Sequence, residues 1–339
     1  ARERVDQLIA RDPGNVRLLG LLFQLQTHER DWGHSQETLR KLRTAGADQV
    51  AADLAEGHVF LAQQQWDKAE AAYVRAAERR PMAPEPLLAL VQLEVKRGQI
   101  APAQSRLEAL LRAHPDHPYA DGFLGELLLM RGDVSGAIPH FETAARLNPK
   151  WSTPWVHLAR AYYGEKRQAE GDGALQKGLE SNPEDEQMRL LLAVSLGAQR
   201  RFDEALGHYE KVLRKNPKSM LAANNLAATL VDHKSDRQSL ERALALSKAF
   251  ESQTPNPYLL DTLGWAHFKL DHGSDAVRLL KQATALAPDH PVLNYHLGAA
   301  LSKAGQHADA RTHLKKALAA EAPFEGLEEA KALLAEMAG

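Results

Sequence analysis

The sequence predicts an all-α protein built from tandem helix-turn-helix repeats of 34 residues. Prolines recur at multiples of this spacing, and Ala47 fills the one position without a proline; the prolines are Pro13, Pro81, Pro115, Pro149, Pro183 and Pro217. Trp32 and Trp66 keep the same interval. Alanine and leucine dominate while only 6% of residues are aromatic, a composition that favours helix throughout. A fixed period of this length is typical of helical-repeat architectures.

The period sets the order of the elements. Residues 1–15 are expected to form the second helix of a truncated preceding repeat. Nine repeats then follow, at 16–49, 50–83, 84–117, 118–151, 152–185, 186–219, 220–256, 257–290 and 291–324. Each should contain two helices of roughly 14 residues. Residues 325–339 should close the array with a capping helix. The opening, ARERVDQLIARDPGN, suggests a segment taken from a longer chain.

The bulk composition excludes several function classes. The chain has 339 residues, which suits two domains or a repeat array. Its 42 Lys and Arg nearly balance its 44 Asp and Glu, so nucleic acid is not the expected partner. Because the chain has no cysteine, disulfides, thiol nucleophiles and cysteine metal sites are excluded. No apolar run approaches the roughly 20 residues that a membrane span needs.

Small and large residues hold fixed positions within the repeats. Repeat 118–151 has Leu124, Gly125, Leu128, Ala137, Phe141 and Pro149. The same positions hold Leu158, Ala159 and Tyr162, then Leu192, Ala193 and Tyr209, then Leu297, Gly298 and Leu314. This pattern resembles the tetratricopeptide repeat family over nearly the whole chain. The resemblance implies a right-handed superhelical solenoid in which the first helix of each repeat lines the concave surface. It also implies a groove that holds peptides, helices or partner domains.

Two repeats depart from the pattern. Repeat 220–256 is three residues too long, and its polar stretch 231–243 predicts either a longer, protruding turn between its helices or a neutral loop variation. The second helix of repeat 152–185 contains Gly171, Gly173 and Gly178, each of which weakens a helix. These glycines indicate either a hinge or close helix packing at Gly171 and Gly178.

One tryptophan lies off the core pattern. Trp265 comes one position after the buried pair of its helix, which turns it toward the concave side. Tyr258, Phe268 and Tyr295 should share that face and form an aromatic patch for a partner. The alternative is that Trp265 packs against the adjoining first helix. Further concave positions expected to contact a partner are Phe123, Glu126, Arg160, Tyr163 and Asn224.

The sequence contains no recognisable catalytic motif, so we expect no enzyme, cofactor or metal. His114 and His117 have a metal-like spacing, but they lie in a proline-bearing turn without a third ligand nearby. There is no phosphate-binding glycine loop and no HExxH sequence.

The last 80 residues resemble the C-terminal end of bacterial envelope tetratricopeptide proteins encoded with exopolysaccharide and exosortase-type export systems. The phrases that carry this second resemblance are LDTLGWAHFKL, YHLGAALSKAGQHADAR and FEGLEEAKALLAEM. It implies a periplasmic scaffold that binds other proteins or peptide segments, with polysaccharide as a further ligand. The alternatives are a cytoplasmic adaptor or assembly chaperone, and the regulatory repeat arm of a larger enzyme.

Overall fold

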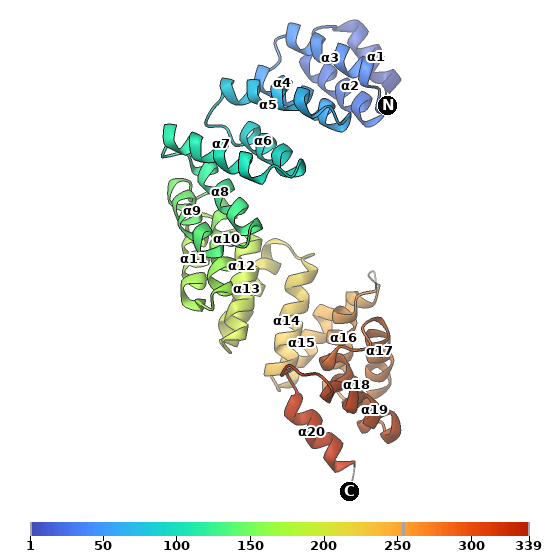
Figure 1. Cartoon of the computed structure of the whole chain (residues 1–339). Helices are drawn as coiled ribbons and strands as arrows, with labels where there is room; N and C mark the ends of the chain where they lie inside the picture. Colours follow the sequence, from blue (N-terminus) through green and yellow to red (C-terminus); the bar gives the residue numbers. More distant parts are fainter. Residues whose placement is uncertain (1, 253–254, 338–339) are drawn as a thin grey trace. The chain divides into compact units, whose positions relative to one another are not determined.

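The computed structural model describes residues 2–252 and 255–337, and these residues form α-helices, one 3₁₀ helix and no strand (Figure 1). The prediction of an all-α helical-repeat fold is therefore confirmed. The helices are α1 (Arg2–Arg11), α2 (Val16–His28), α3 (Trp32–Thr44), α4 (Gln49–Ala62), α5 (Trp66–Arg79), α6 (Pro84–Lys96), α7 (Ile100–Ala113), α8 (Pro118–Met130), α9 (Val134–Leu147), α10 (Ser152–Gly164), α11 (Gln168–Ser181), α12 (Glu186–Ala198), α13 (Phe202–Lys215), α14 (Met220–His233), α15 (Arg237–Ser247), η1 (Lys248–Ser252), α16 (Pro257–Lys269), α17 (Gly273–Leu286), α18 (Pro291–Lys303), α19 (His307–Leu318) and α20 (Leu327–Glu336).

The chain divides into two compact units, residues 1–181 and 182–339. The first contains α1 to α11 and the second contains α12 to α20. Within each compact unit, an even-numbered helix packs against the odd-numbered helix that follows it, and each pair packs against the next. We call the even-numbered helices α2 to α18 the first helices, because each opens a repeat.

The turn inside most repeats places one residue in the left-handed backbone conformation. These residues have φ between 59° and 80°, and they are Arg30, Gln64, Gly98, Gly132, Lys166, Arg200, Asp271 and Gly305. The spacing is 34 throughout, apart from the step across the long repeat. Five of the eight have a side chain, which costs each of them roughly 1–2 kcal/mol. Hydrogen bonds within the turn accompany this conformation, since the amide of the next residue donates back to the first helix, as Asp31 N does to Gln26 O at 2.8 Å.

The extra residues of repeat 220–256 do not form a protruding turn. α14 ends at His233 and α15 begins at Arg237, so the turn 234–236 is as short as the other turns. Its residues, all described, include none with positive φ. The extra length comes instead from the longer α14 and from η1, which follows α15. Phe250 of η1 is buried and faces α16, so the insertion is packed into the link between two repeats.

A small residue facing a large one fixes the approach of the paired helices. A Cβ atom on Gly125 would lie 2.8 Å from the ring of Phe141, and one on Gly264 or Gly298 would lie 2.8 Å from Leu280 or Leu314. In each pair the large residue follows the glycine by 16 positions. The absence of a Cβ on the first helix thus makes room for a large buried side chain of the second.

The glycines of α11 have different surroundings. A Cβ on Gly171 would overlap the ring of Tyr163, whereas a Cβ on Gly173 would have no atom within 4 Å. The contact with Tyr163 favours close helix packing as the reason for Gly171. Close packing does not explain Gly173. The hinge stays a prediction.

None of the helices in the described part of the chain is long and apolar enough to cross a membrane.

Candidate functional site

The first helices α6 and α8 enclose an apolar hollow of about 360 Å³ in the first compact unit. Its lining residues are Leu88, Val91, Gln92, Val95, Lys96, Phe123, Glu126, Leu127 and Met130. Phe123 forms the floor, since it is buried and packs edge-on against Trp151 with ring centroids 5.8 Å apart. Met130 ends α8 and is 61% exposed, so apolar surface remains open to solvent. We call this hollow the α6–α8 groove.

Glu126 supplies the carboxyl group of this groove. Burial raises its pKa, so the neutral carboxyl is favoured relative to a solvated glutamate. The nearest basic group is His157 of α10, whose Nε2 lies 3.8 Å from Glu126 Oε1. Burial and the charge of Arg160 lower the pKa of His157, which opposes an ion pair at this site. The groove therefore combines an apolar surface with the polar groups of Glu126, Gln92 and Lys96.

Two of the other residues expected in the groove, Arg160 and Tyr163, have different surroundings. Arg160 is exposed on α10, and its contact with a partner stays a prediction. Tyr163 is not a free groove residue: it donates a hydrogen bond to Asp172 Oδ1 at 2.7 Å and its ring packs against Gly171 of α11. The reason is that the glycine opposite leaves space for the ring. Tyr163 therefore holds α10 and α11 together.

The aromatic patch of the second compact unit is mostly buried. Trp265 is only 5% exposed; it stacks on Phe268 with ring centroids 4.4 Å apart and on His296 at 3.9 Å. Its Nε1–H donates to Asp232 Oδ1 at 3.0 Å. Tyr295 completes the cluster edge-on, 5.8 Å from Trp265. The expectation of an exposed tryptophan anchor is thus corrected, because the neighbouring rings surround Trp265.

Two expected contact residues lie apart from that cluster. Tyr258, 54% exposed, meets His290 with ring centroids 5.5 Å apart. Asn224 of α14 is half-buried, and its Oδ1 has no hydrogen-bond partner among the described residues. Both stay predicted partner contacts.

Sequence reasoning missed the polar groups beneath the tryptophan. His296 Nδ1 lies 2.9 Å from Asp261 Oδ1, and both side chains are buried. Desolvation by the surrounding protein raises the pKa of the Asp232 carboxyl, whose Oδ1 accepts from Trp265. Asp261 and His296 are 35 residues apart, one more than the period, and this spacing could have indicated that they meet on adjacent first helices.

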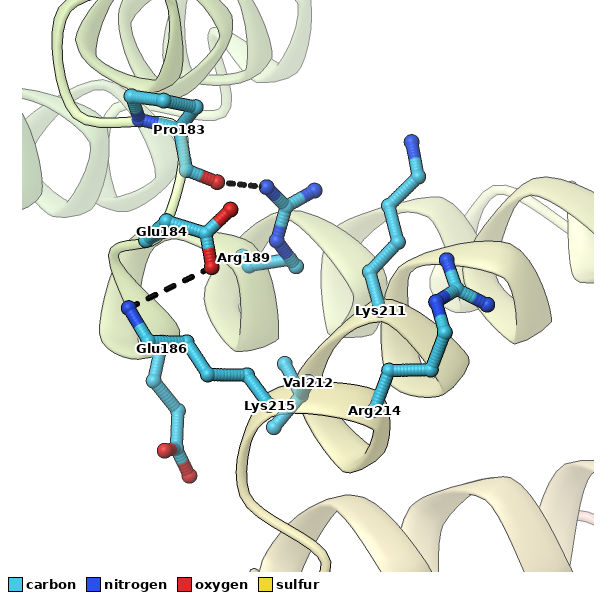
Figure 2. A pocket seen from close by; sticks show the side chains of 8 residues that line it. All are labelled: Pro183, Glu184, Glu186, Arg189, Lys211, Val212, Arg214 and Lys215. Atoms are coloured by element: carbon cyan, nitrogen blue, oxygen red, sulfur yellow. Dashed lines mark hydrogen bonds and ion pairs between the residues drawn. The ribbon is translucent and has the colours of Figure 1, made fainter.

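A basic hollow of about 510 Å³ lies in the second compact unit (Figure 2). Arg189 of α12 donates to the carbonyl of Pro183, and Lys215 Nζ pairs with Glu184 Oε2 at 3.4 Å. Figure 2 shows Lys211 and Arg214 of α13 extending away from these carboxylates. Glu186 is engaged by Ser219 and Asn216, at 2.6 and 3.0 Å. The positive charge of this hollow is consequently reduced by ion pairing at the helix ends, and the hollow is open at one side.

A denser charge network ties repeats together near the N-terminus. Asp53 is completely buried and accepts hydrogen bonds from Arg43 and Arg79 at 2.7 and 2.9 Å. Burial would raise the pKa of Asp53, but these guanidinium groups hold it below its usual value. Because the arginines come from α3 and α5 and the carboxylate from α4, this network is structural.

Of the two histidines in the HPDHP stretch, the second, His117, has a structural role. His117 accepts a hydrogen bond at Nδ1 from the Ala120 amide, 3.1 Å away, and its Nε2 lies 3.0 Å from the Pro81 carbonyl. Both ring nitrogens are therefore used, one to start α8 and the other to join it to the turn between α5 and α6. In the described residues there is no group of three His, Cys, Asp or Glu side chains that could hold a metal ion.

Helix pairs stacked at a 34-residue period, with an open groove on the first helices, define a helical-repeat scaffold. Two family models described as "Tetratricopeptide repeat" match the chain, one at residues 54–90, 88–150 and 190–249 and the other at 128–194 and 268–337. The chain belongs to the tetratricopeptide repeat family. This repeat fold is a scaffold for protein–protein interaction.

Curated relatives share the repeats. The chain is 32% identical to the TPR repeat-containing protein PA4667 of Pseudomonas aeruginosa over 206 residues, 59% of this chain and 32% of that protein. It is 23% identical to the TPR repeat-containing protein YpiA of Bacillus subtilis over 289 residues, 74% of this chain and 67% of that protein. A peroxisomal targeting signal receptor of Candida albicans is 25% identical over 214 residues, 61% of this chain and 36% of the receptor. The chain thus spans about a third of the length of two of these relatives.

Solved structures share the fold. A chain in the crystal structure of the APC/C hetero-tetramer Cut9–Hcn1 has a TM-score of 0.55 and 14% identity, covering 90% of this chain and 59% of that one. YrrB, described as a TPR protein with an unusual peptide-binding site, has a TM-score of 0.48 and 16% identity, covering 59% of this chain and 97% of its own.

Proposed function

We propose that the protein is a non-catalytic scaffold that binds a segment of a partner protein in the α6–α8 groove. The observation that supports this is the open apolar lining of the groove, in which Met130 is exposed and Leu88 and Val95 are only half-buried. A hollow of about 360 Å³ suits a few side chains of a bound segment. The occupant is a helical or extended segment with apolar anchors, because the lining is mostly apolar, with Glu126, Gln92 and Lys96 as its polar groups.

The test begins with peptides selected for binding to the full chain from a random library. Met130→Glu places a charge at the open side of the groove without removing a buried side chain. We expect the selected peptides to contain apolar anchors and to bind this variant at least about tenfold more weakly.

Met82→Glu is the matched control, because Met82 is also an exposed methionine but does not line the groove. It should bind the peptides like the unaltered chain. Equal binding to Met130→Glu and Met82→Glu would refute the groove as the site.

We further propose that the scaffold works in the bacterial envelope, on the periplasmic side, in polysaccharide or protein export or assembly. The support is the resemblance of the last 80 residues to envelope proteins of such systems. Fractionation of the full-length protein tests this proposal. Recovery in the cytoplasm would contradict it and favour an adaptor or assembly chaperone, and a catalytic domain elsewhere in the gene product would favour the regulatory arm. An exopolysaccharide preparation that binds the purified chain would make the polymer a direct ligand.

A further inference from the structure

After α19 the chain leaves the repeat pattern and crosses the first helices of its own compact unit. The ring of Phe324 lies 6.4 Å from that of Tyr295 on α18, measured between centroids. The next residue, Glu325, places Oε1 3.4 Å from Nε2 of His233, at the end of α14. Figure 1 shows this stretch returning toward α14 before α20 begins. One short segment therefore contacts first helices that are two repeats apart.

Gly326 fits this segment closely against the helices. Its φ of 92° is left-handed, and a Cβ atom there would overlap the ring of Tyr295. Glycine is thus required twice, by the backbone conformation and by the contact. Tyr295 in turn packs on Trp265, so the segment covers the aromatic cluster described above.

The covering changes the exposure of the first helices beneath it. All residues from Leu293 to Leu301 of α18 are buried. The first helix α12 of the same compact unit instead leaves Val194 exposed. The cover is itself held weakly, since the carboxylate of Glu325 is 65% exposed and α20 buries only Ala330 among its residues. Segments with few buried contacts open most readily.

We infer that the face formed by α14, α16 and α18 is a second binding surface, which the chain's own residues 321–326 occupy. The partner it fits is a protein segment with an aromatic residue followed by a carboxylate and a glycine. The aromatic side chain meets Tyr295, the carboxylate meets His233, and the glycine lets the backbone pass the tyrosine ring. The partner binds by displacing residues 321–326.

This inference rests on the proposed function in one respect, namely that partner segments bind to first helices. The α6–α8 groove lies in the other compact unit, so each site is tested by its own substitutions. Met130→Glu should leave binding at the second surface unchanged, and loss of the groove site would not affect the outcome below.

The test uses the full chain and a labelled peptide with the sequence of residues 320–329, AEAPFEGLEE. Gly326→Ala should release the internal segment through both backbone strain and the clash with Tyr295. Fluorescence anisotropy should show the peptide binding this variant at least about tenfold more tightly than the unaltered chain. A peptide with alanine in place of the phenylalanine should bind at least about tenfold more weakly to Gly326→Ala.

Gly305→Ala is the matched control, because Gly305 also has a positive φ of 74° but a Cβ there would have no atom within 4 Å. It should bind the peptide like the unaltered chain. Phe324→Ala gives a second release variant at a half-buried position and should also bind the peptide more tightly. Equal binding by the unaltered chain and both release variants, or equal binding of the two peptides, would overturn the inference.

Discussion

At the scale of residues, exposure distinguishes partner contacts from packing. Trp265 and Tyr258 are seven positions apart on α16, and the sequence assigns both to one aromatic patch. The structure buries Trp265 between Phe268 and His296 and leaves Tyr258 more than half exposed. The period identified Trp265 as unusual but could not show what lies over it, because His296 and Tyr295 of α18 reach it through tertiary packing.

This difference predicts opposite outcomes for two aromatic substitutions. Trp265→Ala should destabilise the second compact unit by about 3–5 kcal/mol, since it removes a large buried ring and a hydrogen bond. Tyr258→Ala, the matched control, should change stability by no more than about 0.5 kcal/mol. Calorimetry with hydrogen exchange of α16 measures both. Similar stability in the two variants would mean that Trp265 is not a core residue.

Glu126 gives the groove a pH dependence. Its raised pKa means that the folded protein binds the proton more tightly than the unfolded chain. The associated stability is present below the unfolded pKa and is lost as pH rises through the folded pKa. Glu126→Gln should therefore gain stability relative to the unaltered chain toward neutral pH, by less than about 1 kcal/mol because the side chain is 34% exposed.

Parallel denaturant titrations at several pH values measure this difference. His157 lies beside Glu126, and its lowered pKa works in the opposite direction, since it costs stability as the pH falls. The double variant with His157→Gln separates the two groups. A stability difference that grows toward acid pH in that background would contradict the account of Glu126.

At the scale of elements, the sequence located the helices well and one turn poorly. The 34-residue period predicts helix-turn-helix pairs, and most of their turns place a residue at the same position in the left-handed conformation. The polar stretch 231–243 was interpreted as a protruding turn because charged residues are common in loops. Most of it is helix in the structure, and the surplus residues lie around η1, which Phe250 anchors. Polarity alone does not distinguish an exposed helix face from a loop.

The glycines of α11 give a paired prediction at this scale. Gly173→Ala should stabilise the helix by roughly 0.5–1 kcal/mol, because its Cβ enters open space within a regular helix. Gly171→Ala should destabilise it, because the new atom overlaps Tyr163. Hydrogen exchange should be faster in 165–180 than in 200–215 if α11 is a hinge. Equal protection of the two stretches would remove the hinge.

At the scale of the whole molecule, the fold was predictable and the site only partly so. The same packing contact recurs in several repeats, so residues such as Gly125 and Phe141 are enough to predict the helix pairs. The α6–α8 groove includes the predicted Phe123 and Glu126, yet the exposure of Met130 and the engagement of Tyr163 with α11 depend on packing between helices. The covering of α18 by residues 321–326 depends on a segment outside the period.

The central claim is that partner segments bind the first helices at the α6–α8 groove. Hydrogen exchange of the full chain, with and without a peptide selected for binding, tests it most directly. The account predicts added protection in α6 and α8, with α7 and α9 little changed and with the effect abolished by Met130→Glu. Protection confined to the second helices α7 and α9, or unchanged protection throughout α6 and α8, would contradict it.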